Sequence, residues 1–171
     1  GDLPGLGFVP TADASGQVVM TVTAIATETD GDTAEVSSPL TVDIAGTADL
    51  PSFALSDAVG SEDSGVLLSI VAGLADTDGS ESLVVTISGV PDGASLSAGI
   101  ETEPGVWSLS APELADLQYL PAPNQSGPVT LTVTATSTES NGDSAEIASS
   151  LTVDVAAVAD TPTLAVLGAT G

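Results

Sequence analysis

The sequence predicts an all-β protein built from antiparallel β-sandwich modules in tandem. Residues 1–60 read as a second copy of residues 112–171, offset by 111 positions without a gap and identical at about 28 of 60 positions. Short runs that alternate between apolar and polar residues dominate the chain, as expected for strands with one buried and one solvated face. A chain that repeats itself in register is built from stacked modules rather than from one catalytic domain.

Six alternating runs predict the main strands, and turn residues separate them. The runs lie at residues 18–25, 40–44, 67–71, 83–87, 129–135 and 151–155. Asp30-Gly31 and Asn141-Gly142 occupy equivalent places in the two copies, each between two long runs. Asp-Gly and Asn-Gly are strong hairpin signals, so each pair of runs is expected to form a hairpin. Residues 111–115 are expected to form a single helical turn.

The positions of the linkers set the module boundaries. Seven or eight short strands in about 110 residues are typical of an immunoglobulin-like sandwich. Linkers are expected at residues 48–51 and 159–162, where each copy has a Pro that cannot donate to a sheet. Residues 50–160 are then one complete repeat, residues 1–49 the C-terminal half of another, and residues 161–171 the first strand of the next. The half-module should have open sheet edges unless something covers them.

The chain has an extreme charge. It contains 24 acidic residues and no Lys, Arg or His, which gives a formal net charge of −24. Uncompensated charge of this size opposes compaction. Yet 42% of the residues are hydrophobic, which is too apolar a mixture for a disordered acidic tail. The counter-charge must therefore come from solution, and divalent cations are the obvious source.

The missing residue types exclude much chemistry. Without Cys, His or Lys there is no thiolate, imidazole or Schiff base, and no P-loop. A surface this negative is unsuited to nucleic acid, and no apolar run approaches the roughly 20 residues that span a bilayer. We therefore expect no enzymatic activity, no small-molecule substrate, no nucleic-acid partner and no insertion into a membrane.

The sandwich model gathers acidic residues at the two ends of the complete repeat. We call the end that receives the incoming linker the near pole, and the opposite end the far pole. The near pole is expected to hold Asp49, Asp76, Asp78, Glu81, Glu139 and Asp143; the far pole Glu62, Asp63 and Asp160; and the hairpin of the half-module Glu28 and Asp32. Clustered carboxylates have raised pKa values unless a cation is present, and Ca²⁺ takes six to eight oxygens in flexible geometry. The sequence therefore predicts Ca²⁺ as a cofactor at these residues.

Each of these assignments has an alternative. The loop that starts at Asp76 begins like an EF-hand, but its twelfth position is Ile87 where Glu is needed, so a calcium loop of another kind is expected. The alternative is a polar turn with solvated carboxylates, or simple capping by the linker residues Asp49 and Asp160. Four mid-strand acids are expected on solvated faces: Glu35, Asp43, Glu146 and Asp154.

A threonine ladder and a few aromatic residues suggest a second possible function. Thr130, Thr132, Thr134, Thr136 and Thr138 alternate along one strand. Such ladders can bind ice or glycans, although the strand propensity of Thr accounts for them as well. Trp107 and Tyr119 are expected in the core. The alternative function is an extracellular module that recognises glycan, protein or ice.

Four segments resemble the tandem repeats of giant bacterial RTX adhesins. They are Ala-Asp-Thr-Asp-Gly-Ser-Glu-Ser-Leu at 75–83, Ile-Ser-Gly-Val-Pro-Asp-Gly-Ala-Ser-Leu-Ser at 87–97, Leu-Thr-Val-Thr-Ala-Thr-Ser-Thr-Glu at 131–139 and Val-Ala-Asp-Thr-Pro-Thr-Leu at 158–164. The resemblance covers essentially the whole chain. The glycine-rich nonapeptide repeats that give the family its name are absent from it.

The resemblance implies immunoglobulin-like or cadherin-like extender domains that are secreted and fold on meeting external calcium. In that family the extenders hold a terminal adhesive domain away from the bacterial surface, and calcium at the junctions makes the array rigid. The implied junction ligands are Asp49, Asp76, Asp78, Glu81 and Asp160. The implied partners are calcium ions and neighbouring repeats of the same chain, in an extracellular location.

Overall fold

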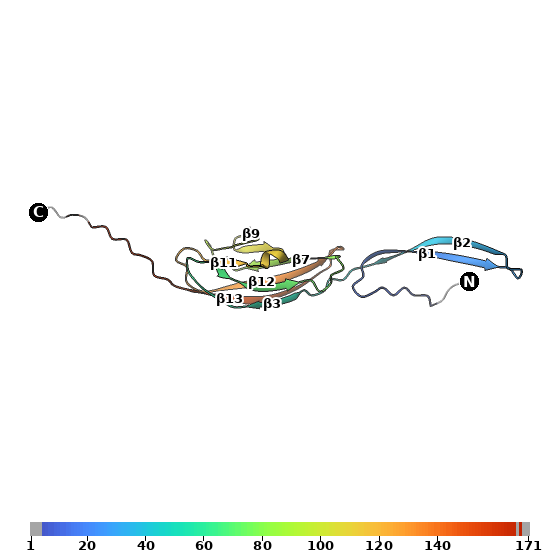
Figure 1. The fold of residues 1–171 in the computed structure, drawn as a ribbon, viewed down its shortest axis with the longest axis horizontal. Helices are drawn as coiled ribbons and strands as arrows, with labels where there is room; N and C mark the ends of the chain where they lie inside the picture. The colour runs from blue at the N-terminus through green and yellow to red at the C-terminus, as the bar shows by residue number, and fades with distance from the viewer. Residues whose placement is uncertain (1–4, 167, 169–171) are drawn as a thin grey trace. The chain divides into compact units, whose positions relative to one another are not determined.

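The computed structural model describes residues 5–166 and residue 168. The chain is all-β, with antiparallel sheets consistent with a β-sandwich, which confirms the predicted fold class (Figure 1). Immunoglobulin-like connectivity stays a prediction. No helix within the described residues is long and apolar enough to cross a membrane.

The first element is a long hairpin of β1 (Gly16–Thr27) and β2 (Thr33–Ile44). The two strands pair antiparallel from Gly16↔Ile44 to Thr27↔Thr33. Two backbone hydrogen bonds close the turn, from the N–H of Glu28 to the carbonyl of Asp32 (2.8 Å) and from the N–H of Gly31 to the carbonyl of Glu28 (3.0 Å). Gly31 has φ +92°, a conformation that disfavours a side chain. Within the described residues, β1 and β2 pair only with each other.

The same hairpin recurs 111 residues later as β12 (Gly127–Glu139) and β13 (Ser144–Ala156). Its turn repeats both hydrogen bonds, from Glu139 to Asp143 (2.9 Å) and from Gly142 to Glu139 (2.9 Å). Gly142 has φ +93° and so matches Gly31. The repeated sequence therefore specifies the same local structure twice, and both predicted hairpins are confirmed.

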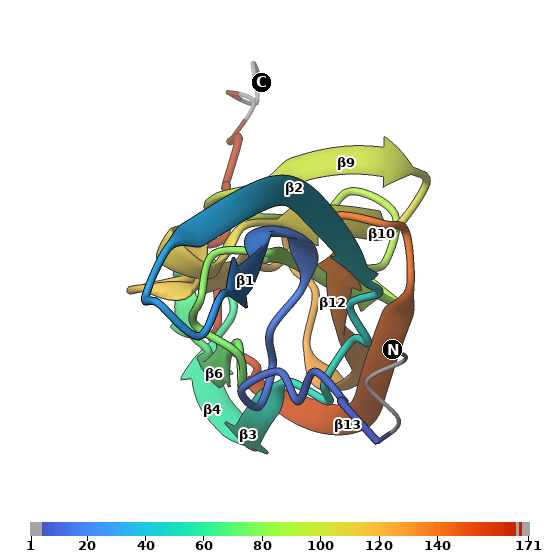
Figure 2. The same ribbon diagram turned by 90° about the vertical axis from the view of Figure 1, so that its right-hand side faces the viewer.

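In the complete repeat this hairpin lies in the middle of a six-stranded sheet, in the order β4-β13-β12-β7-β10-β9. In Figure 2, β9 and β10 lie in the upper part of this view, and β13 and β4 lie in the lower part. The further strands of this sheet are β4 (Ala58–Ser61), β7 (Glu81–Ser88), β9 (Ile100–Glu103) and β10 (Val106–Leu109). β4 pairs parallel to β13, from Val153↔Ala58 to Ala156↔Ser61.

Two smaller antiparallel sheets complete the repeat. One has the order β5-β11-β8 and the other pairs β3 with β6. Their strands are β3 (Ser52–Ser56), β5 (Val66–Leu67), β6 (Ser69–Gly73), β8 (Ser95–Leu96) and β11 (Gln118–Leu120). The predicted helical turn is the 3₁₀ helix η1 (Ala111–Leu114). The N–H and hydroxyl of Ser110 both donate to Glu113 Oε2 (2.7 Å each), and these bonds lower the pKa of Glu113.

The core follows the period-two pattern of the strands. Leu131 and Val133 on β12, Ile87 on β7 and Val153 on β13 are fully buried. Tyr119 is also fully buried, as predicted; its hydroxyl donates to Gln125 Oε1 (3.0 Å), and burial raises its pKa. Trp107 is only partly buried, which confirms its expected core position in part. The threonines of β12 alternate with the buried residues and lie on the opposite, more solvated face.

The complete repeat contains more strands than the seven or eight expected, because several are short. The predicted run 67–71 is divided between β5 and β6, where the N–H of Leu68 leaves the ladder and donates to the carbonyl of Leu117 (2.8 Å). β9 carries two glutamates and gave no apolar signal. The strand expected at 161–171 is not formed over 161–166; residues 167 and 169–171 lie outside the described residues.

The chain divides into two compact units. The first consists of residues 5–51, 74–83 and 136–146, and so contains the β1–β2 hairpin, the linker and the near-pole turns. Among the described residues, the second consists of residues 52–73, 84–135 and 147–166 together with residue 168, and so contains the core of the repeat and the far pole. β7, β12 and β13 run through both units, so the division does not follow strand boundaries.

Candidate metal site

Carboxylates of the near pole bind the backbone of the incoming linker, which in the structure runs from residue 45 to 51, between β2 and β3; the outgoing linker begins at residue 157, after β13. Glu81 Oε1 accepts the N–H of Asp49 (2.8 Å), and Asp143 Oδ2 accepts the N–H of Ala48 (2.9 Å). An extended linker leaves its N–H groups without ladder partners, and these side chains satisfy them. Three residues of the predicted site, Asp49, Glu81 and Asp143, are therefore brought together, with Asp49 contributing its backbone.

Two further side chains, neither of them among the predicted metal ligands, bind the same linker. Asn141 Nδ2 donates to the carbonyl of Gly46 (2.7 Å), and the hydroxyl of Ser137 donates to the carbonyl of Asp49. Ser137 is fully buried. The linker is thus held through both its donors and its acceptors.

In the loop after β6, two carboxylates accept backbone N–H groups of the same loop. Asp76 Oδ1 accepts the N–H of Asp78 (2.8 Å), and Asp78 Oδ1 accepts the N–H of Ser80 (2.7 Å), so two Asx turns follow one another. The Ser80 hydroxyl lies 3.4 Å from Asp76 Oδ2 and 3.2 Å from Glu139 Oε1. Because one hydroxyl has one proton, it can donate to only one of these two carboxylates at a time.

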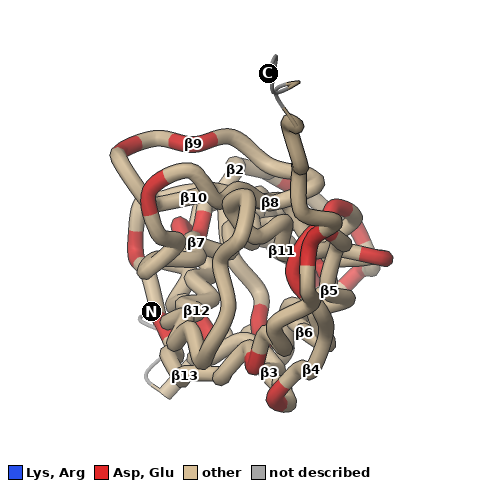
Figure 3. Tube along the Cα trace, turned by 90° about the vertical axis from the view of Figure 1, so that its left-hand side faces the viewer, with Lys and Arg blue, Asp and Glu red and all other residues tan. Residues whose placement is uncertain are grey.

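Three of the near-pole acids are buried, namely Asp76, Glu81 and Glu139, whereas Asp49, Asp78 and Asp143 are exposed. Glu81 Oε2 is buried and has no hydrogen-bond donor among the described residues. Buried charges in proteins are normally paired or bound to metals. The sequence contains no Lys, Arg or His to pair with them, and Figure 3 shows the Asp and Glu residues in red with no blue Lys or Arg among the described residues. The near pole therefore has more buried acceptors than donors.

An open pocket at the same end is lined by three carboxylates, those of Asp13, Asp49 and Glu139. Asp13 was not predicted as a site residue. It has φ +60°, and its equivalent in the second copy, Asn124, has φ +58°. Asp and Asn tolerate this left-handed conformation better than most residues. A short polar side chain occurs at this position in both copies, and this recurrence is the sequence signal that could have pointed to Asp13.

Gly46 allows the Glu139 carboxyl group to approach the linker. A Cβ atom at this position would lie 2.5 Å from Glu139 Cδ, which is closer than non-bonded carbon atoms come. A side chain here would therefore displace the carboxyl group of Glu139, and glycine lets this group stay close to the linker. The equivalent residue in the second linker is Ala157.

The acidic side chains of the described residues do not form a metal coordination sphere. Over residues 5–166 and 168, no group of three or more acidic side chains has an arrangement that could hold a metal ion. The near-pole carboxylates bind backbone N–H groups and Ser80 instead. The donor set, of carboxylates and nearby carbonyls, suits Ca²⁺ chemically. Calcium binding stays a prediction.

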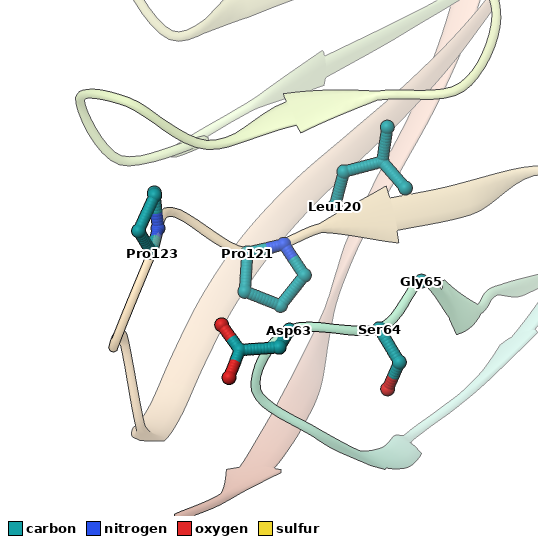
Figure 4. A pocket seen from close by; sticks show the side chains of 6 residues that line it. All are labelled: Asp63, Ser64, Gly65, Leu120, Pro121 and Pro123. Carbon is teal, nitrogen blue, oxygen red and sulfur yellow. The ribbon is translucent and has the colours of Figure 1, made fainter. Parts of the chain in front are cut away.

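At the far pole, Glu62 binds the outgoing linker. It is buried, and its Oε1 accepts the N–H of Val158 (2.6 Å) while its own N–H donates to the carbonyl of Ala156 (3.0 Å). Asp63 is exposed, has φ +61° and lines a shallow pocket with Pro121 and Pro123 (Figure 4). Asp160 is exposed as well. Glu62 thus accepts a backbone N–H of the outgoing linker, as Glu81 accepts one of the incoming linker.

The remaining predicted site residues lie on the β1–β2 turn, and Glu28 and Asp32 are both exposed there. The N–H of Asp32 donates to Asp30 Oδ1 (3.1 Å), which makes an ordinary Asx turn. The four mid-strand acids, Glu35, Asp43, Glu146 and Asp154, are exposed as expected.

Neither a family model nor a curated protein matches the chain. The fold and this site define an all-β repeat protein with acidic, linker-binding joints.

We expect Ser80→Ala to raise the pKa of Asp78 toward its usual range. The hydroxyl and N–H of Ser80 hold this pKa down, and the substitution removes the hydroxyl, whose one proton is shared with Asp76 and Glu139. A depressed carboxyl pKa stabilises the fold above the unfolded-state pKa, and this stabilisation is lost as pH falls through the folded-state pKa. A carboxyl NMR titration of Asp78 in calcium-free buffer measures the change. An unchanged pKa would show that the Ser80 hydroxyl does not act on Asp78.

Proposed function

We propose that this chain is part of a calcium-stabilised structural spacer, or extender, of a large secreted bacterial surface adhesin. One observation carries the proposal. Asp76, Glu81 and Glu139 are each buried at the near pole, one oxygen of Glu81 lacks a donor among the described residues, and the chain has no cationic side chain. A cation from solution is the remaining source of counter-charge.

The same carboxylates that need a counter-ion also bind the linker. Glu81 accepts the N–H of Asp49, and Asp143 accepts that of Ala48. Ca²⁺, when bound, would supply positive charge and accept further oxygens from Asp13, Asp76 or Glu139. The ordering of the joint and the binding of the cation are then linked, because both depend on the positions of these side chains.

A spacer also fits the rest of the molecule. Strands, turns and linker acids all recur at the 111-residue spacing. Glu28 corresponds to Glu139, Asp32 to Asp143 and Asp49 to Asp160. Three pockets among the described residues, those beside Asp63, Glu101 and Asp13, are open surface depressions rather than deep clefts. With the resemblance to adhesin repeats, these features support an extracellular array that projects a distal adhesive domain.

The test is thermal unfolding of the whole chain in chelator, in millimolar Ca²⁺ and in millimolar Mg²⁺. A ligand that binds only the folded state stabilises it by about 2.7 kcal/mol at a free concentration about 100 times its Kd. We expect the melting temperature to rise with Ca²⁺ and much less with Mg²⁺, which favours rigid octahedral sites and keeps its waters. Melting that is indifferent to Ca²⁺ and to chelator would contradict the proposal.

A second measurement separates a spacer from a binding module. The calcium-loaded chain is applied to a glycan array and assayed for thermal hysteresis. We expect neither saturable glycan binding nor depression of the freezing point. Clear, saturable binding would favour the alternative function over the spacer.

A further inference from the structure

The turn between β12 and β13 contains Asn141-Gly142, the one Asn-Gly pair of the sequence. Asparagine is thermolabile, because the following backbone nitrogen can attack its side-chain amide, and a glycine in that place has no side chain to hinder the attack. Both residues are exposed, so water can reach them. The pair therefore has the sequence and the access that spontaneous deamidation needs.

Hydrogen bonds of the folded near pole oppose this reaction. Asn141 Nδ2 donates to the carbonyl of Gly46 in the incoming linker (2.7 Å), and Asn141 Oδ1 accepts the N–H of Asp143 (2.8 Å). The N–H of Gly142, whose nitrogen would be the nucleophile, donates to the carbonyl of Glu139 (2.9 Å). Attack needs a deprotonated nitrogen and an amide that is free to turn toward it. The bond to Gly46 adds to this restraint only while the linker is in place.

The first copy of the repeat has, at this position, the residue that deamidation would produce. Asp30 corresponds to Asn141, and Gly31 to Gly142. Asp30 Oδ1 accepts the N–H of Asp32 (3.1 Å), which is the same Asx turn that Asn141 makes. The two turns also have the same backbone hydrogen bonds. An aspartate therefore fits this turn.

The contact with the linker, unlike the turn, depends on the amide group. The NH₂ of Asn141 is the donor to the carbonyl of Gly46, whereas a carboxylate has no proton to donate. An aspartate would place an anionic oxygen against this carbonyl oxygen, on a turn where Asp143 already carries a charge and accepts the N–H of Ala48. Deamidation would thus remove one hydrogen bond of the linker and replace it by a repulsive contact.

We propose that Asn141 is a deamidation site whose reaction is controlled by the linker bound beside it. The nitrogen of Gly142 attacks Cγ of Asn141 and closes a succinimide ring; the Cγ–Nδ2 bond breaks, and the amide leaves as ammonia with the proton of Gly142. Water then opens the ring at either carbonyl and gives aspartate or isoaspartate. A bound linker slows the first step, and a linker that is released for long loses this contact permanently. The inference does not rest on the proposed metal site.

The test follows the whole chain by mass spectrometry in mildly alkaline buffer with millimolar Ca²⁺, once folded and once in denaturant. Cleavage after glutamate isolates residues 140–146, which contain Asn141, and residues 114–139, which contain Asn124, the other asparagine of the sequence. We expect Asn141 to deamidate in denaturant faster than Asn124, which precedes Gln125, and at least about tenfold more slowly when folded. No reaction of Asn141 in denaturant, or equal rates in the two states, would overturn the proposal.

Two serine variants test the control by the linker. Ser137→Ala removes a hydroxyl that donates to the carbonyl of Asp49, whereas the hydroxyl of Ser150 lies beside Thr132 on the strands. Because the reaction proceeds from the released linker, loss of one hydrogen bond should speed deamidation of the folded chain about fivefold in Ser137→Ala, and Ser150→Ala should leave it unchanged. The fluorescence of Trp107 checks that the repeat stays folded. An unchanged rate in folded Ser137→Ala would contradict control by the linker.

A variant that mimics the product tests the consequence without waiting for the reaction. Asn141→Asp should speed hydrogen exchange of the Ala48 N–H about fivefold, because the linker has lost one bond. Asn124→Asp is the matched control, since it adds the same charge and the first copy has Asp13 at the equivalent position. We expect no change of exchange at Ala48 in Asn124→Asp. Equal exchange in the two variants would show that the amide of Asn141 does not hold the linker, and would overturn the proposal.

Discussion

Glu81→Gln is expected to change stability in opposite directions with and without calcium. In chelator the substitution removes a buried negative charge that has no counter-charge, while the remaining oxygen still accepts the N–H of Asp49. In Ca²⁺ the substitution would remove a charged ligand of the proposed metal site. We expect the melting temperature to rise in chelator and to fall in Ca²⁺. In each buffer the free energy of unfolding should change by about 1–3 kcal/mol in the same direction as the melting temperature.

Glu146→Gln is the matched control for this experiment. Glu146 lies on β13 and is exposed, so the substitution removes the same charge without changing the buried cluster. Surface substitutions of this kind usually change stability by less than about 0.5 kcal/mol. Thermal unfolding of both variants, with and without Ca²⁺, gives four shifts to compare. A shift of the same sign for Glu81→Gln in both buffers would show that Glu81 is a structural residue rather than a cation ligand.

Leu151→Ala is expected to destabilise the complete repeat far more than Leu40→Ala. Leu151 is buried in the core, and removing a buried Leu side chain costs about 2–5 kcal/mol. Leu40, its equivalent 111 residues earlier, is about half exposed, so truncation there leaves no cavity in the repeat. Chemical denaturation followed by the fluorescence of Trp107, which lies in the complete repeat, reports the difference.

The comparison is sharp because the two residues occupy the same position of the same hairpin. Their sequence surroundings are nearly identical, with Leu-Thr-Val-Asp in both copies. Only the cover supplied by residues 52–126 differs. Similar losses for Leu40→Ala and Leu151→Ala would mean that the first hairpin also contributes to the core that Trp107 reports.

The sequence predicted the hairpins well because two local signals coincide there. Period-two alternation gives the strands, and the Gly31 and Gly142 turns fix where they reverse. β9 could not be predicted in this way, because its Ile-Glu-Thr-Glu sequence has little apolar character and it pairs at the edge of the sheet. The division of the run 67–71 depends on a hydrogen bond to Leu117, about 50 residues away, which no local pattern contains.

The sequence predicted where the candidate site lies, but not which atoms its side chains contact. The direction of each strand indicates which turns meet at the near pole, and Glu81 and Asp143 were found in this way. The linker decides which atoms these carboxylates bind. Its backbone N–H groups have no strand partner, so they donate to the same carboxylate oxygens that a cation would use. Ser137 could not be recognised from the sequence, because a buried serine in a strand looks like any other residue of the alternating pattern.

Gly46 has a consequence for how repeats follow one another. The linker before the complete repeat places a glycine against Glu139, whereas the next linker has Ala157 at the same position. An alanine there cannot lie against a glutamate placed like Glu139 unless the linker or the side chain shifts by several tenths of an ångström. A glutamate beside Ala157 would therefore need another side-chain conformation than the one Glu139 has beside Gly46. Gly46 and Ala157 thus set different limits on the side chain that can lie against each linker.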